Sequence, residues 1–178
     1  MTKVLAIDTS TSRTSVAIIE ADTVVFSGFL DGATVHGPSL PALVQEALAK
    51  SEVNEVVVGM GPGPFTGLRV GIAFAQSFAL ARNIPVRGVC SLDAIAAQIN
   101  EKDFIITVDA RRKEVYWARY TGGVRVGEPA VNFPADVSGA PIHADLFPDM
   151  QALVNLPRNI TEPIYLRRPD AVATADRP

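Results

Sequence analysis

The sequence is poor in the residues that build several kinds of functional centre. Its 178 residues include one cysteine, Cys90, so no disulfide can form within the chain and an oxidising compartment is not indicated. The only histidines are His36 and His143, which are 107 positions apart, and His36 has no second ligand nearby in the sequence. A metallopeptidase helix needs two histidines on one face. We therefore expect both histidines and Cys90 to be structural, and we expect no metal site.

A strong charge bias and a long apolar run are also missing. The net charge of −3 provides no global attraction to nucleic acid or to an anionic membrane. The longest apolar stretch, residues 71–81, is interrupted by Gln76 and Ser77 and is too short to cross a bilayer. The N-terminus becomes polar too early for a secretory signal. With 48% hydrophobic residues, these features favour a globular cytoplasmic protein without membrane contact.

Short apolar stretches and helical periodicities alternate along the first hundred residues. Strands are predicted at 4–7, 15–19, 24–29, 55–60 and 86–89. Helices are predicted at 40–48, with Ser39 as N-cap, at 67–82 and at 91–99. Three consecutive strands followed by alternating helices and strands are typical of an RNase H-like α/β lobe.

A weaker version of the same pattern begins after residue 103. The segments LAIDTSTSRTSVAII and ITVDARRKEVYWARY each contain a strand, an aspartate at its end, a polar turn and a second strand. Asp8 and Asp109 hold matching places. Most prolines lie after residue 122, where no long helix is predicted. We expect a lobe at 1–100 that carries partner-binding helices, and a reduced second lobe at 101–178 with a proline-rich C-terminal segment.

The stretch GMGPGPFTGLR, residues 59–69, is a glycine-rich corner between a strand and a helix. A phosphate-binding P-loop needs a lysine after its last glycine, and none follows here. Pro62 and Pro64 each lack the backbone N–H that such a loop uses. We therefore predict a backbone corner, with Thr66 as a possible cap for the helix.

The predicted helix 67–82 is apolar around its whole circumference. Gly67, Gly71, Ala75 and Ala79 form a ridge of small residues at i+4 steps. A sheet covers only one side of such a helix, so a partner or another segment of the chain must cover the other side. We expect an interface on this helix and on the helix 40–48. Its candidate residues are Leu40, Leu43, Val44, Leu48, Leu68, Arg69, Gly71, Ile72, Ala75 and Ala79.

Five segments together carry a family resemblance. They are LAIDTSTSRTSVAI, GPGPFTGLRVG at 61–71, CSLDAIA at 90–96, TVDARRKEVYWA at 107–118 and PIYLRRP at 163–169. The chain resembles the bacterial TsaB (YeaZ-type) proteins. The resemblance implies two RNase H-like lobes of the acetate kinase, Hsp70 and actin-like superfamily. It also implies a noncatalytic subunit of the machinery that makes N6-threonylcarbamoyladenosine (t6A) at position 37 of tRNAs reading codons that begin with A.

The same resemblance implies partners and leaves alternatives. It implies pairing with TsaD, the catalytic paralogue, through the first-lobe helices, a homodimer through much the same surface, and an ATPase partner, TsaE. Contact with tRNA is left open. The resemblance implies no cofactor beyond a weak ATP or ADP contact at an interface, for which Asp8 and Asp109 are the candidates. An ATP-using small-molecule kinase of the same superfamily is the alternative function, and a glycoprotease-type metallopeptidase is a more distant one.

The chain departs from the family pattern at two points. The family loop usually reads GPGSFTGLR, and Pro64 stands here in place of the serine. The second lobe is also expected to be shorter than in the proteins that the chain resembles.

Overall fold

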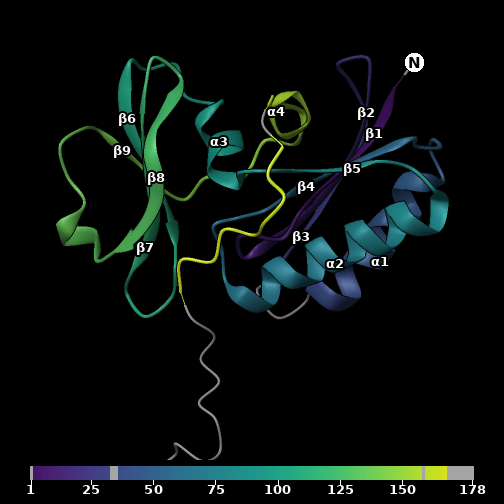
Figure 1. The fold of residues 1–178 in the computed structure, drawn as a ribbon, viewed down its shortest axis with the longest axis horizontal. Helices are drawn as coiled ribbons and strands as arrows, with labels where there is room; N and C mark the ends of the chain where they lie inside the picture. Colours follow the sequence, from purple (N-terminus) through teal and green to yellow (C-terminus); the bar gives the residue numbers. More distant parts are fainter. Residues whose placement is uncertain (1, 33–35, 158, 168–178) are drawn as a thin grey trace, which may run out of the picture.

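The computed structural model describes residues 2–32, 36–157 and 159–167, and it contains two β-sheets that lie side by side (Figure 1). The first sheet has five strands in the order β3-β2-β1-β4-β5. These are β1 (Lys3–Asp8), β2 (Arg13–Glu20), β3 (Thr23–Asp31), β4 (Glu55–Gly59) and β5 (Val86–Val89). The first three strands are antiparallel neighbours, while β1, β4 and β5 run parallel.

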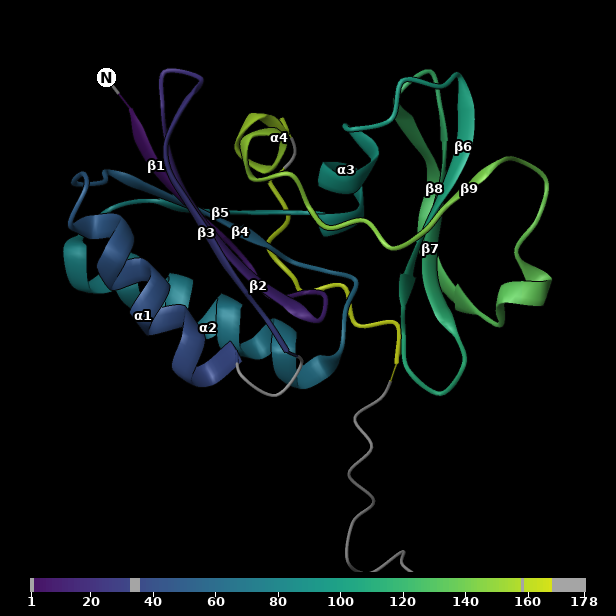
Figure 2. The same ribbon diagram turned by 180° about the vertical axis from the view of Figure 1, so that it is seen from behind.

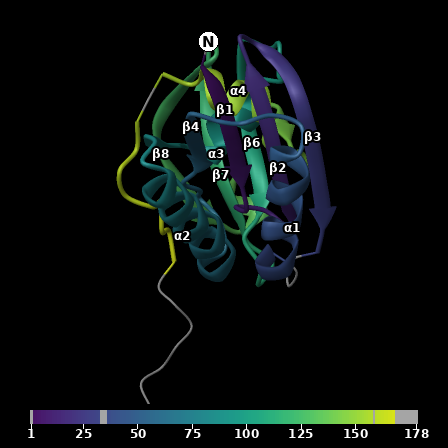
Figure 3. The ribbon, with the colours of Figure 1, turned by 90° about the vertical axis from the view of Figure 1, so that its right-hand side faces the viewer.

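Two helices cover one face of this sheet. Figures 2 and 3 show α1 (His36–Leu48) and α2 (Phe65–Arg82) side by side on that face. Because side chains alternate along a strand, Leu5 and Ile7 of β1 point towards these helices. They pack with Leu40 of α1 and Leu68 of α2 in the largest apolar cluster.

The opposite face of the first sheet is covered by shorter helices. Val4 and Ala6 of β1 contact Leu153 of α4 (Met150–Asn155), which returns from late in the sequence. The helix α3 (Ser91–Ala96) follows β5 directly and packs against both sheets (Figure 1). Both faces of the parallel strands are therefore buried, as their continuous apolar sequences require.

The second sheet repeats the start of the first. Its order β8-β7-β6-β9 corresponds to β3-β2-β1-β4, with two antiparallel pairings followed by a parallel one. The strands are β6 (Asp103–Asp109), β7 (Val115–Thr121), β8 (Val124–Asn132) and β9 (Ile142–His143), with the short 3₁₀ turn η1 (Pro134–Asp136) between β8 and β9. A turn thus stands where the first lobe has α1. The predicted fold of two RNase H-like lobes, the second reduced, is confirmed.

Several boundaries differ from the sequence prediction. Helix α1 begins at His36 rather than after Ser39, and α2 begins at Phe65, so Thr66 lies inside it rather than capping it. Helix α3 ends at Ala96 instead of near residue 99. The left-handed Asn83 ends α2 as predicted, because its N–H bonds the carbonyls of Ala79 and Leu80.

The C-terminal segment packs against the first lobe. The N–H of Ile160 donates to the carbonyl of Gly88 at 2.7 Å, and that of Ile164 donates to the carbonyl of Met60 at 2.8 Å. The described residues after 101 therefore contribute both a sheet of their own and a cover for the first sheet. Pro169, the last residue of the C-terminal motif, lies outside the described residues.

Candidate functional site

Asp8 ends β1 in a fully packed turn. It is 1% exposed, and its carboxylate accepts hydrogen bonds from the N–H of Ser10 (2.9 Å), the hydroxyl of Ser10 (2.7 Å) and the hydroxyl of Ser91 (2.6 Å). Burial is the largest influence on this group and raises the pKa of Asp8, although these hydrogen bonds and nearby His36 act in the opposite direction. The expected nucleotide contact at Asp8 therefore has no exposed carboxylate oxygen to use.

The glycine-rich corner fills the space beside this turn. A Cβ at Gly59 would lie 1.8 Å from Oδ2 of Asp8, one at Gly63 would lie 2.3 Å from the carbonyl oxygen of Ser10, and one at Gly71 would lie 2.3 Å from Oγ1 of Thr9. The hydroxyl of Thr9 donates to the carbonyl of Gly67 at 2.7 Å. The glycines therefore permit close backbone packing, which agrees with the prediction of a corner rather than a phosphate cradle.

Pro64 is the N-cap residue of α2. Its φ of −59° and ψ of 132° suit proline, and its carbonyl accepts the N–H of Leu68 at 3.0 Å. No side chain caps this helix end. Replacement of the family serine by proline thus preserves the corner's backbone but removes the hydroxyl that would cap the helix.

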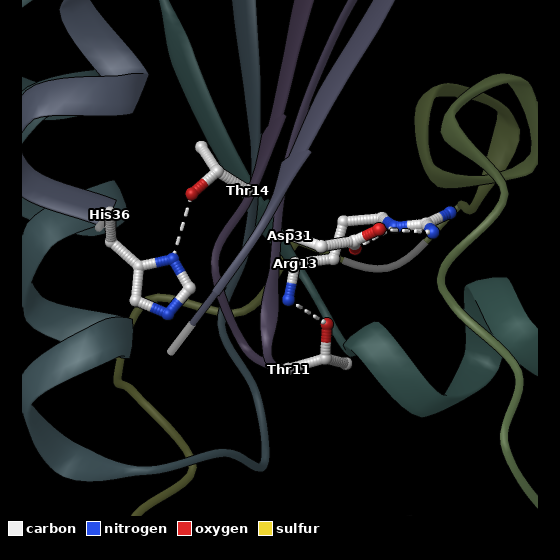
Figure 4. Close-up of polar contacts among 5 residues, drawn as sticks. All are labelled: Thr11, Arg13, Thr14, Asp31 and His36. Atoms are coloured by element: carbon white, nitrogen blue, oxygen red, sulfur yellow. Dashed lines mark hydrogen bonds and ion pairs between the residues drawn. The ribbon is translucent and has the colours of Figure 1, made fainter. Parts of the chain in front are cut away.

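Figure 4 shows the polar contacts that join β2 to α1 and β3. His36 is 5% exposed, and its Nδ1 lies 2.8 Å from Oγ1 of Thr14; burial is the main cause that lowers its pKa. Arg13 forms two hydrogen bonds with Asp31, at 2.7 and 3.1 Å, and its guanidinium carbon lies 3.8 Å from the ring centroids of both Phe29 and Phe147. These residues serve packing between elements.

The remaining histidine and the cysteine are also part of the packing. Nε2 of His143 lies 3.0 Å from a carboxylate oxygen of Glu101. Burial raises the pKa of the Cys90 thiol to about 12, so it is protonated at neutral pH. Within residues 2–32, 36–157 and 159–167, no three histidine, cysteine, aspartate or glutamate side chains form a group that could hold a metal ion.

Asp109 ends β6 in the same way that Asp8 ends β1, but it is exposed. Its Oδ1 accepts the N–H of Arg111 at 2.9 Å, as Asp8 accepts that of Ser10. A cleft of about 80 Å³ lies between the two turns, lined by residues that include Thr11, Asp109 and Arg111. Sites for drug-sized ligands usually measure roughly 300–1,000 Å³. The two aspartates share a local geometry but not an environment.

The structure places most of the expected interface residues in the core of the chain itself. Eight are buried, namely Leu40, Leu43, Val44, Leu68, Gly71, Ile72, Ala75 and Ala79, while Leu48 is partly buried and Arg69 is exposed. The small-residue ridge faces the turn at Thr9 and the sheet, not solvent. Those eight residues therefore have no free surface for a partner, and a substitution such as Gly71→Arg would disrupt the fold.

The surface that α1 and α2 do expose is poor in charge. The exposed residues of α2 include Ala73, Ser77, Leu80 and Ala81, with Leu80 83% exposed, and Val70, Phe74 and Phe78 are partly buried beside them. Across both helices the charged residues are Glu46 and, near the two ends of α2, Arg69 and Arg82. The interface residues expected from the sequence did not include these outward residues, although the polar residues Thr66, Gln76 and Ser77 mark the side of α2 that faces solvent.

None of the helices in the described part of the chain combines the length and the apolar content needed to cross a membrane.

Comparison with known proteins places this geometry in context. The family model for TsaD, tRNA N6-adenosine threonylcarbamoyltransferase, matches residues 33–168. The uncharacterised protein Rv3421c of Mycobacterium tuberculosis is 43% identical, over 94% of this chain and 93% of that protein. The tRNA threonylcarbamoyladenosine biosynthesis protein TsaB of Escherichia coli is 37% identical, over 66% of this chain and 54% of that protein.

Solved structures agree with these sequence matches. YeaZ from Pseudomonas aeruginosa superposes with a TM-score of 0.73 at 27% identity, covering 87% of this chain and 90% of that one. A second P. aeruginosa structure, described as similar to the peptidase YeaZ, gives a TM-score of 0.79 at 27% identity and covers 94% of this chain and all of that one.

The corner predicts a large effect of a single methyl group. Gly63→Ala should lower the free energy of unfolding by about 3 kcal/mol, because its Cβ would meet the Ser10 backbone, which no side-chain rotation can relieve. Urea unfolding of the purified chain measures this. Gly37→Ala in α1 is the control, since nothing lies within 4 Å of its Cβ, and it should stabilise the helix by up to about 1 kcal/mol. Equal stability of the two variants would contradict the proposed packing.

Burial of Asp8 predicts a pH dependence. Because the folded state raises the pKa of Asp8, its contribution to stability is complete below the unfolded value of about 3.9 and is lost as pH rises through the folded value. Asp8→Asn should therefore lose less stability than the wild type as the pH rises from about 4 towards neutrality. Urea unfolding across this range tests it, with exposed Asp136→Asn as control. Parallel curves for wild type and Asp8→Asn would exclude a raised pKa.

Proposed function

Since this chain belongs to the TsaD family and is a TsaB-type member of it, we propose that it is a noncatalytic subunit required for t6A37 modification of tRNA. In this role it binds and supports a TsaD-type catalytic subunit, together with a TsaE-type ATPase. In isolation it forms a homodimer through the same surface. The names of the TsaB relatives refer to the biosynthesis of the modified nucleoside and do not mention binding. The binding role is therefore what is proposed.

The observation that carries the proposal is the uncovered outer side of α1 and α2. Depletion of charged residues and the presence of aromatic ones distinguish the centres of protein interfaces from ordinary surface. Here Ala73, Ser77 and Ala81 are exposed at i+4 steps, with Phe74 and Phe78 stacked beside them at a centroid distance of 6.0 Å. Small exposed residues let a second helix approach closely, and the aromatic rings supply apolar area for it to cover.

The kinase alternative has less support. Such an enzyme would use Asp8 or Asp109 near the phosphates of ATP, but Asp8 is buried against Ser10 and Ser91. The closely packed glycine corner occupies the space next to it. This alternative requires ATP turnover by the purified chain that is lost in Asp8→Asn, and the proposed binding role requires none.

A substitution at the centre of the outer face tests the binding role. Ser77→Arg should reduce capture of the TsaD-type partner, and homodimer formation, by at least about 100-fold, because a bulky cation would stand where a close helix contact is needed. Co-purification of tagged partner measures capture, and analytical ultracentrifugation measures the dimer.

An exposed serine of the second lobe provides a matched control. Ser138 lies between η1 and β9, away from α2, so Ser138→Arg makes the same substitution outside the proposed interface. It should leave capture and dimerisation unchanged. If Ser77→Arg still captures the partner as well as Ser138→Arg does, the outer face of α2 is not the interface. A wild-type chain that captures no TsaD-type subunit would contradict the proposed function itself.

A further inference from the structure

The turn between β6 and β7 carries three adjacent cations in an unfavourable backbone conformation. Arg111, Arg112 and Lys113 are all exposed and have φ values of 64°, 55° and 63°. Left-handed backbone is unfavourable for residues other than glycine, and like charges at adjacent positions repel. The next turn of the same sheet, between β7 and β8, uses Gly122 and Gly123 at positive φ. The cationic turn is therefore not explained by the needs of the hairpin.

Its counterpart in the first lobe has the opposite character. The turn after Asp8 contains Thr9, Ser10 and Thr11, all buried, and it is packed against the glycine corner. The turn after Asp109 has the same aspartate-to-N–H hydrogen bond, but it faces solvent. Two equivalent hairpins have thus diverged, one towards packing and the other towards an exposed positive charge.

The C-terminal segment extends this charge. Arg167 pairs with Glu114, and its guanidinium donates to the carbonyl of Arg111 at 3.5 Å. Glu114 is thereby paired with a cation outside the turn. The carboxylate of Asp109 lies 3.6 Å from the guanidinium of Arg111.

Aromatic residues connect the turn to the start of α2. Tyr165, 39% exposed, lies 4.9 Å from Phe65 between ring centroids, and the guanidinium carbon of Arg69 lies 4.6 Å from the centroid of Phe65. Figures 1 and 2 show the C-terminal segment passing between the N-terminal end of α2 and the β6–β7 turn. We call this surface, from Arg69 through Tyr165 to the turn 111–113, the basic–aromatic strip.

We propose that the basic–aromatic strip binds single-stranded RNA, with phosphates on Arg111–Lys113 and an unstacked base on Tyr165. Cations beside an exposed aromatic ring suit RNA because phosphates attract the cations and every base offers a face for stacking on the ring. Phosphate binding also explains why cations occupy a turn that glycine would suit better, since binding sites often retain backbone strain. This inference rests on the proposed function, in which the natural RNA is a tRNA.

A charge reversal tests the strip. The probe is an unmodified transcript of a tRNA that reads codons beginning with A, and its binding is followed by fluorescence anisotropy at several salt concentrations. Arg112→Glu combined with Lys113→Glu should weaken binding by at least about tenfold and lower the salt slope by about 1.4, or about 0.7 for each lost phosphate contact. Lys50→Glu combined with Lys102→Glu, at exposed sites, changes the net charge equally and should have an effect of about twofold at most.

Two further variants separate stacking and strain from charge. Tyr165→Leu should weaken binding by about tenfold while Tyr165→Phe retains it, because phenylalanine keeps the aromatic face. Lys113→Gly should raise the melting temperature by a few degrees, since glycine tolerates the positive φ, and should still weaken RNA binding. If the turn has no role in binding, Lys113→Gly should raise the melting temperature without weakening RNA binding.

The outcomes distinguish this inference from the proposed function. The chain with Arg112→Glu and Lys113→Glu should capture the TsaD-type partner as well as the wild type does. If it loses capture, the turn belongs to the partner interface of the proposed function and not to an RNA-binding strip. Equal weakening by both double variants, undetectable binding by the wild type, or tighter binding of polyglutamate than of tRNA would each overturn the inference. The last result would identify an acidic protein segment as the ligand.

Discussion

The close contact between the Asp8–Ser10 turn and the start of α2 is the constraint on which the rest of the first lobe depends. The hydroxyl of Thr9 bonds the carbonyl of Gly67, and glycines at 63 and 71 let the two backbones meet. This contact fixes where α2 begins and which of its sides faces the sheet. It also occupies the space beside Asp8, so the same packing that orients the helix leaves little room for a phosphate group there.

Once that contact orients α2, the character of its outer face follows. Leu68, Ile72, Ala75 and Ala79 are directed into the core, which leaves Ala73, Ser77, Leu80 and Ala81 in solvent. The same side carries the polar residues Thr66, Arg69 and Gln76, so α2 exposes a mixed surface on which Leu80 is 83% exposed. The uncovered face is therefore a consequence of how the helix is seated, and the binding role proposed for it uses a surface that the fold cannot bury by itself.

The order of strands, the corner and the extent of α2 could be predicted because each has a local signal: alternation, glycine and proline at the corner, and Asn83 at the helix end. The orientation of α2 was predicted wrongly, although its exposed polar residues Thr66, Gln76 and Ser77 lie on the side opposite the small-residue ridge. Gly67 and Gly71 looked like a surface ridge, but they contact Thr9, which is distant in the sequence. Likewise, α4 has only six residues, and its position is decided by tertiary contacts of Met150 and Leu153.

The two exposed surfaces meet at one end of α2 without sharing their central residues. The charge-poor face is centred on Ser77, whereas the basic–aromatic strip begins at Arg69 and Phe65 and leaves the helix through Tyr165. A partner seated on α1 and α2 can therefore leave the turn at 111–113 uncovered, because that turn belongs to the second sheet. RNA held by such a partner near this end of α2 would meet the strip at the margin of the interface. The reduced second lobe then keeps a specific task, because its first hairpin supplies the cations that the packed hairpin of the first lobe lacks.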